Sequence, residues 1–161
     1  MAGSVTTVTA WADAIVAALR PAFGSECELI GAYNLFDQGG SSYPKLTGQH
    51  ALLLRAGDAE VVTGPGVRDR QGITIEWTVT IAVPTNAERP DLLALDRAIR
   101  VATFIRQPGT DRNTRANRWG LDSAVFDTDP ITPSLPEWDD VDQHGYLLRP
   151  VRWRQTGYFQ R

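Results

Sequence analysis

The clearest pattern of hydrophobic and polar positions lies in residues 72–84, where the two kinds alternate. One side carries only hydrophobic residues, Ile73, Ile75, Trp77, Val79, Ile81 and Val83. The other side carries Thr74, Glu76, Thr78, Thr80 and Ala82. A period of two sustained over this length predicts one strand longer than the usual five or six residues. We therefore expect it to cross the whole domain or to project from it.

Two segments follow a helical period instead. The first has its large hydrophobic residues at every fourth position, Trp11, Ile15, Leu19 and Phe23. With Thr9 as candidate N-cap, it predicts a helix over about 9–22. A second helix is predicted over about 90–106, with hydrophobic positions at Leu92, Leu95, Ile99, Ala102 and Ile105. We expect both helices to cover the hydrophobic side of the long strand, and the threonine-rich side to need less cover.

The remaining segments complete an α+β domain. Residues 50–57 and 59–64 predict two short strands joined at Gly57-Asp58, which lead into the long strand as an antiparallel meander. Residues 146–160 are strand-like, with Pro150 favouring an edge or a bulge. A long irregular loop over about 107–144 holds one candidate strand, at 123–126. We predict a single domain, 1–161, with the helices on one face of a mainly antiparallel sheet.

Composition narrows the classes of function. The chain has 161 residues, 42% of them hydrophobic and 22% charged, which fits one domain with its own core. A formal net charge of -3 gives no basic excess of the kind that free-standing nucleic-acid binders carry. Cys27 is the single cysteine, so an intrachain disulfide and a cysteine zinc site are excluded. Without a signal peptide or a membrane-length hydrophobic run, we expect a soluble protein in the cell that makes it.

Catalytic motifs are missing from the sequence. His50 and His144 have no metal-ligand spacing, and no nucleophile or phosphate-binding motif occurs. The long loop is acidic, with Asp122, Asp127, Asp129, Glu137, Asp139, Asp140 and Asp142. Clustered carboxylates can bind Ca²⁺ or Mg²⁺, but the calcium-loop spacing is absent and a solvated loop is the better interpretation. We expect no enzyme activity, no cofactor and no metal, with a metal-dependent enzyme kept as an alternative.

An arginine repeat in the same loop points to a protein partner. Arg112, Arg115 and Arg118 recur at every third position and lead into Trp119, and Trp138 lies further along the loop. Arginine and tryptophan are enriched in the residues that dominate protein interfaces, and the nearby carboxylates argue against DNA. These residues are our candidate subunit or partner interface. A solvated surface is the alternative.

The order of elements resembles a known family. It comprises an N-terminal helix, a glycine-rich loop, a meander with the strand "ITIEWTVTIAV", the helix "PDLLALDRAIRVATFI" and C-terminal strands. This order is similar to that of the tail terminator proteins of long-tailed bacteriophages, also called minor tail protein U-like or tail-completion proteins. The resemblance implies a virion protein that forms a six-fold ring on the head-proximal end of the tail tube. Such a ring ends tube polymerisation and joins the tail to the head connector.

The resemblance also implies partners. We expect a homo-hexamer, assembled in the host cytoplasm, that contacts the tail tube protein and the head-side connector protein. DNA would pass through the lumen without specific binding, and the acidic residues Asp127, Asp129, Asp139 and Asp140 would face it. A head-tail connector or adaptor subunit is the nearest alternative. A small ligand-binding domain is another, from a different class.

Overall fold

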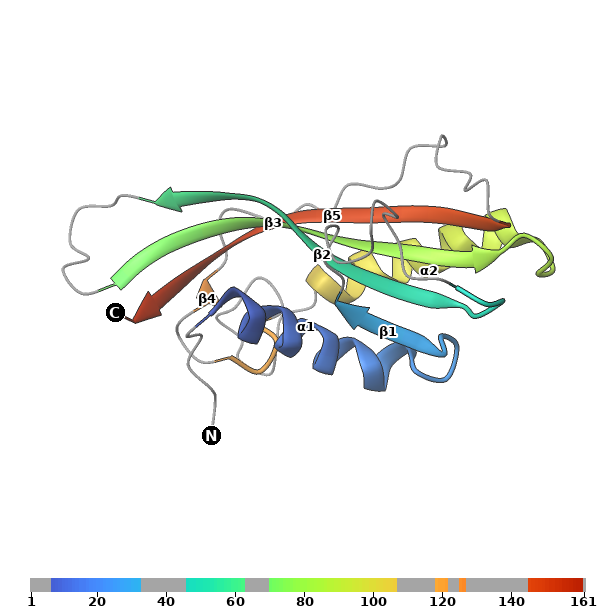
Figure 1. Ribbon diagram of the computed structural model, residues 1–161, viewed down its shortest axis with the longest axis horizontal. Helices are drawn as coiled ribbons and strands as arrows, with labels where there is room; N and C mark the ends of the chain where they lie inside the picture. The colour runs from blue at the N-terminus through green and yellow to red at the C-terminus, as the bar shows by residue number, and fades with distance from the viewer. Residues whose placement is uncertain are drawn as a thin grey trace.

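The computed structural model describes residues 7–32, 46–62, 70–106, 118–121, 125–126 and 145–160. The elements, in chain order, are α1 (Val8–Phe23), β1 (Leu29–Ala32), β2 (Ala51–Val62), β3 (Arg70–Pro84), α2 (Pro90–Arg106), β4 (Val125–Phe126) and β5 (Tyr146–Gln160). Two helices and a mostly antiparallel sheet make this an α+β fold (Figure 1). The predicted fold class is confirmed at this level.

Within the described ranges, the strands form one sheet in the order β1-β2-β3-β5-β4. Of the strand pairs in the described part of the chain, only β1–β2 is parallel. Three strands are long, with 12 residues in β2, 15 in β3 and 15 in β5, whereas the sequence predicted one. They run side by side along the long axis of the molecule (Figure 1). Because β5 pairs with the whole of β3 and β2 with most of it, the backbone of β3 is satisfied on both sides.

Strand β2 is continuous, which corrects the prediction of two short strands joined at Gly57-Asp58. Ala56 pairs with Trp77 and Ala59 pairs with Ile75, so Gly57 and Asp58 together stand opposite a single residue of β3. This is a β-bulge, which adds one residue to a strand without reversing it. A Gly-Asp pair suits either a turn or a bulge, and the sequence pattern did not separate the two.

Helix α1 uses the hydrophobic face that the sequence predicted. Its buried residues are Trp11, Ile15, Val16, Leu19 and Phe23. The N-cap is Thr7 and not Thr9, because the Thr7 hydroxyl oxygen accepts a hydrogen bond of 3.0 Å from the backbone N–H of Ala10. The Trp11 ring meets the Trp77 ring edge-on at 5.2 Å and lies over Gly157. A Cβ atom at Gly157 would lie 2.9 Å from Trp11 Cζ3, so the indole needs a glycine there.

Helix α2 packs with a different face from the predicted one. The side against the sheet carries Ala94, Arg97, Ala98, Val101 and Ile105. In contrast, Leu92 is 54% exposed, Ile99 is 47% exposed and Leu95 is half-buried. Small alanine side chains let the helix approach the sheet closely, so the positions of the larger hydrophobic residues did not indicate the buried side. Consequently α2 keeps a second hydrophobic stripe on its outer side.

The threonine-rich side of β3 is also buried, which corrects the expectation that it needs less cover. Thr74, Thr78, Thr80 and Ala82 are all buried. A second hydrophobic cluster on this side consists of Ala51, Leu53, Ala82, Tyr146 and Leu148. The hydroxyl groups of Thr74 and Thr156 hydrogen-bond to each other at 2.7 Å, which satisfies two buried polar groups. Both faces of the central strands therefore belong to the interior.

Candidate functional site

Most of the predicted interface and lumen residues lie outside the described residues. These are Arg112, Arg115 and Trp138 of the interface, and Asp127, Asp129, Asp139 and Asp140 of the acidic set. Their roles stay predictions. Of the interface set, the structure describes Arg118, which is half-buried, and Trp119.

Trp119 lies in the hydrophobic core. The residue is 5% exposed, and its ring centre lies 6.0 Å from that of Trp153 and 6.3 Å from that of Phe104. The indole Nε1 donates a hydrogen bond of 2.8 Å to Oε1 of Gln155, which is fully buried. A buried, hydrogen-bonded indole holds the 118–121 turn against β5 and α2. This is a structural role, and we do not carry Trp119 into the interface proposed below.

The exposed part of β2 is the first candidate surface. β1 covers the outer edge of β2 only at residues 51–54, and every residue from 56 to 61 is exposed. We call residues 56–61 the β2 arm. Figure 1 shows the ends of the long strands, including the arm, projecting beyond the first turn of α1. Among the described residues, no strand pairs with the outer edge of the arm, so its outward backbone groups face away from the sheet.

The side chains of the β2 arm combine charge with one large hydrophobic group. Val61 is 53% exposed. The Glu60 carboxylate lies 3.1 Å from Nη2 of Arg154, across the sheet on β5. Both side chains are well exposed, so this ion pair contributes under about 1 kcal/mol and leaves the arm accessible.

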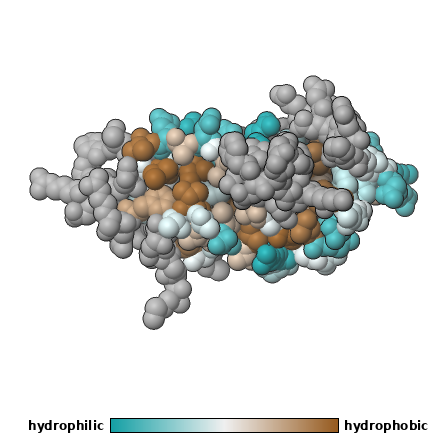
Figure 2. All heavy atoms as spheres, in the orientation of Figure 1, coloured by the Kyte–Doolittle hydropathy of each residue, from teal (hydrophilic) through white to brown (hydrophobic). Residues whose placement is uncertain are grey.

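Hydrophobic residues are also unevenly spread on the face drawn in Figure 2. They gather in the left half, where Figure 1 places the ends of the long strands, and below the centre, where it places α1 and β1. Hydrophilic residues line the upper and right-hand margins. The described part of the surface is therefore mixed on this side, as expected for a protein with a buried core and exposed loops.

A network of charged side chains, missed by the sequence analysis, ties α2 to two distant segments. The side chain of Arg97, 7% exposed, has Nε 3.6 Å from Oε2 of Glu26 and Nη2 3.3 Å from the Glu26 carbonyl oxygen. Its Nη1 lies 2.6 Å from Nδ1 of His50. Because a guanidinium only donates, Nδ1 accepts, and the neutral His50 ring carries its proton on Nε2. Arg97 thus joins the turn after α1 to the start of β2.

Arg100 extends this network to the surface. Its two terminal nitrogens each donate a 2.7 Å hydrogen bond to one carboxylate oxygen of Glu26, and its guanidinium lies 5.5 Å from the Phe23 ring centre. The backbone N–H of His50 in turn donates to the Glu28 carboxylate at 2.8 Å. Five residues drawn from segments far apart in the chain leave no local signal, so sequence reasoning had nothing to find here.

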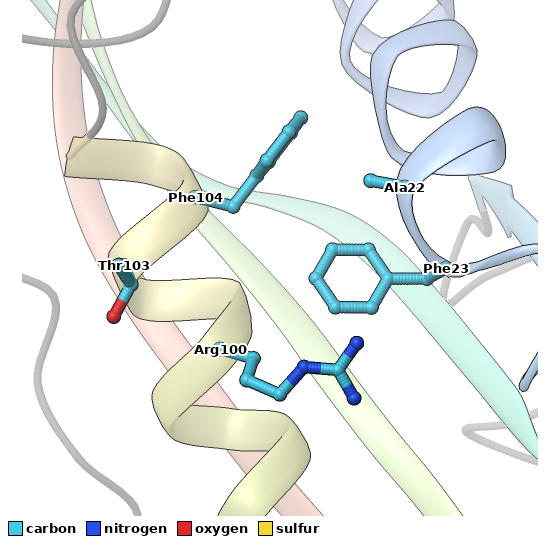
Figure 3. A pocket seen from close by; sticks show the side chains of 5 residues that line it. All are labelled: Ala22, Phe23, Arg100, Thr103 and Phe104. Atoms are coloured by element: carbon cyan, nitrogen blue, oxygen red, sulfur yellow. The ribbon is translucent and has the colours of Figure 1, made fainter.

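A shallow hollow opens beside Arg100, between the end of α1 and the middle of α2 (Figure 3). It has a volume of about 280 Å³ and is lined by Ala22, Phe23, Arg100, Thr103 and Phe104. The Phe23 and Phe104 rings pack edge-on, with centres 5.8 Å apart. Since Glu26 already holds Arg100, the hollow marks where the two helices meet and offers no free charge to a ligand.

The network predicts a loss of stability in acid. Hydrogen bonds from Arg100 lower the pKa of Glu26, and backbone hydrogen bonds lower the pKa of Glu28. Burial, followed by the nearby Arg97 charge, lowers the pKa of His50. As the pH falls, each of these three groups takes up its proton at a higher pH in the unfolded chain than in the folded protein. The stabilisation is therefore complete above the unfolded pKa values, about 6.5 for histidine and 4.3 for glutamate, and is lost as the pH falls through the folded ones.

We expect the free energy of unfolding, measured with urea between pH 7.5 and pH 4, to fall in two stages. His50→Asn is the control, because its amide oxygen still accepts from Arg97 but does not titrate. The variant should lose the stage nearer neutrality and keep the acid stage. A free energy that rises on going from pH 7 to pH 5 would contradict the assignment.

Cys27 follows Glu26 but takes no part in the network. It is buried, and burial raises the pKa of its thiol to about 11. At neutral pH it therefore stays a protonated, unreactive thiol. Cys27 packs with the hydrophobic core.

The described ranges contain no group of three or more histidine, cysteine, aspartate or glutamate residues placed to hold a metal ion. Neither described helix has the length and hydrophobicity needed to cross a membrane. The sequence matches no protein family model and is not significantly similar to any curated protein.

Proposed function

We propose that this protein is a structural subunit that assembles into a ring at the head-proximal end of a phage tail tube. There it ends tube polymerisation and joins the tail to the head connector. The observation that carries the proposal is the β2 arm, an exposed edge strand projecting from an otherwise packed domain. The order of its elements, which resembles that of tail terminator proteins, supplies the biological setting.

An exposed edge strand is suited to directional assembly. A closed ring of identical subunits needs a head-to-tail contact, in which one patch of each subunit binds a different patch of the next. Strand addition at a sheet edge provides such a contact, because backbone hydrogen bonds fix both the direction and the register. The six residues 56–61 span about 20 Å in extended form, which is long enough for several of these bonds.

In this proposal the ring contacts two other proteins, the tail tube protein and the head-side connector. The lumen is a passage for DNA and not a binding site. A subunit with a net charge of -3 suits that role, because like charge keeps a polyanion from adhering to the wall. We propose a hexamer, by the same resemblance.

The test is the charge substitution Val61→Arg on the β2 arm. We expect it to abolish rings, since each head-to-tail contact would then have to bury one arginine side chain at an edge that must exclude water. The monomer should keep its stability within about 0.5 kcal/mol, because Val61 is exposed. The matched control is Ala17→Arg on the exposed side of α1, which should leave rings intact.

Three measurements decide the outcome. Light scattering across protein concentration, with Mg²⁺ and with added tail tubes, gives the mass, negative-stain imaging gives the shape, and urea unfolding checks the fold. Rings in the wild type and in Ala17→Arg, but not in Val61→Arg, support the proposal. Wild-type protein that stays monomeric even on tail tubes contradicts it.

In phage lacking the protein, overlong tails indicate a terminator, whereas normal tails beside tailless heads indicate a connector.

A further inference from the structure

The outer side of α2 carries hydrophobic residues that the core does not use. Leu92, Leu95 and Ile99 are spaced by three and four residues, so they form one stripe along the helix, here called the α2 stripe. Leu92 and Ile99 are about half exposed, although the fold would also accept alanine or a charged residue at these positions. A single exposed leucine is ordinary, but aligned large residues on one helix side are typical of a contact surface.

The charges beside the α2 stripe are arranged by sign along the helix. Asp91 lies in the first turn and Arg106 in the last turn, whereas Asp96 between them pairs with Arg100 of the same helix at 3.8 Å. Each end charge is favourable for the helix dipole by itself. Together, Asp91 and Arg106 make one end of the stripe acidic and the other basic. Such a stripe complements a second copy of itself when the two helices run in opposite directions.

We propose that two copies of this chain pair through α2, antiparallel and centred on Ile99. In this arrangement Ile99 packs against Ile99 of the partner subunit, and Leu92 covers the stem of Arg106 of the partner subunit. Asp91 and Arg106 lie almost equally far from Ile99 in opposite directions, so the pairing brings them together at both ends. Parallel pairing would place like charges side by side, which is unfavourable.

The pairing is separate from the ring contact and goes beyond the proposed function. It is isologous, with the same stripe on both subunits, and closes at two copies. The β2 arm is on another element and takes no part in it. Glu26 holds Arg100 with two hydrogen bonds, so this residue does not compete for Asp91.

A cysteine placed on the two-fold axis gives a direct test. Packed helices lie about 8–10 Å apart and have a Cα radius of about 2.3 Å, which brings facing Cα atoms to about 3.4–5.4 Å. A disulfide needs about 4.4–6.8 Å, so oxidised Ile99→Cys should become mostly cross-linked dimer. Cys27 needs no replacement, since it is buried and its thiol pKa is about 11. Ala17→Cys, exposed on α1, is the matched control and should stay uncross-linked.

A second test reverses the charges at the two ends of the stripe and measures the dimer Kd by sedimentation equilibrium. Asp91→Arg alone and Arg106→Asp alone should each raise the dimer Kd about 5-fold or more, because the ion pair occurs twice in the dimer. The two changes together should return the Kd to within about 2-fold of wild type. Circular dichroism confirms that each variant keeps its helices.

Either of two results overturns the pairing. The first is that Ile99→Cys cross-links no more than Ala17→Cys at about 100 µM protein. At this concentration a dimer with a Kd of about 100 µM or lower is well populated. The second is that the dimer Kd of the double charge reversal is as high as that of the single changes. The two proposals fail separately. Cross-linked Ile99→Cys together with wild-type protein that forms no rings, even on tail tubes, contradicts the ring alone, whereas wild-type rings together with Ile99→Cys that does not cross-link contradict this pairing alone.

Discussion

Replacing Trp77 with alanine should lower the free energy of unfolding by about 3–5 kcal/mol, the largest effect that we expect from any single change. Trp77 is fully buried at the centre of the sheet. It contacts Trp11 of α1 and stands opposite Trp153 of β5, so the truncation leaves a cavity where three elements meet. Urea unfolding measures the change, and for a chain of this length the Tm should fall by roughly 6–20 °C.

A matched substitution separates the cavity from general damage to the sheet. Val61→Ala removes a hydrophobic side chain from the neighbouring strand at an exposed position, and should cost less than about 0.5 kcal/mol. If Trp77→Ala were as mild as Val61→Ala, the packing of α1 on the sheet described above would be wrong. The result depends on the fold alone and not on either proposed assembly.

The second large effect is expected at Arg97. Replacing it with leucine removes the contacts to Glu26 and His50 while keeping a hydrophobic stem in the buried site. Removing one partner of a buried ion pair costs about 3–5 kcal/mol, and the partial exposure of Glu26 reduces our expectation to about 2–3 kcal/mol. Urea unfolding at pH 7.5 measures it. The acid stage of the pH profile should shrink in the same variant.

Arg100→Leu is the control for Arg97→Leu, because both arginines bind the Glu26 carboxylate, but Arg100 is more exposed and does not contact His50. The Arg100 side chain is 42% exposed, so its loss should cost less than about 1 kcal/mol. Equal losses at the two positions would show that the charge, and not its burial, sets the stability. A larger loss at Arg100 would reverse the roles that we assign to them.

The two helices show what the sequence could and could not predict. In α1 the large residues lie on one side and small or polar residues on the others, so periodicity predicted both the helix and its buried face. In α2 the large residues Leu92 and Ile99 lie opposite the alanines that face the sheet. Periodicity found the helix but chose the wrong side, because it weighs hydrophobicity and not how closely a backbone must approach its neighbour.

The candidate surfaces were less predictable than the fold. The β2 arm is exposed because β1 is short, and the length of one strand relative to another is set by pairing and not by either sequence alone. The Glu26, Arg97 and His50 network joins segments that no local pattern connects. The arginine repeat at Arg112 and Arg115 was visible in the sequence, and its role as an interface stays a prediction.

The bulge at Gly57-Asp58 bears on the selectivity of assembly. With one residue fewer at this point, β2 would form a regular ladder with β3, and its free edge would be straighter and flatter. Flat edges pair with almost any extended chain, which is how strand-mediated aggregation and amyloid begin. A bulge increases the twist of an edge. In the assembly proposed above, such an edge would favour a partner strand of matching shape over other extended chains.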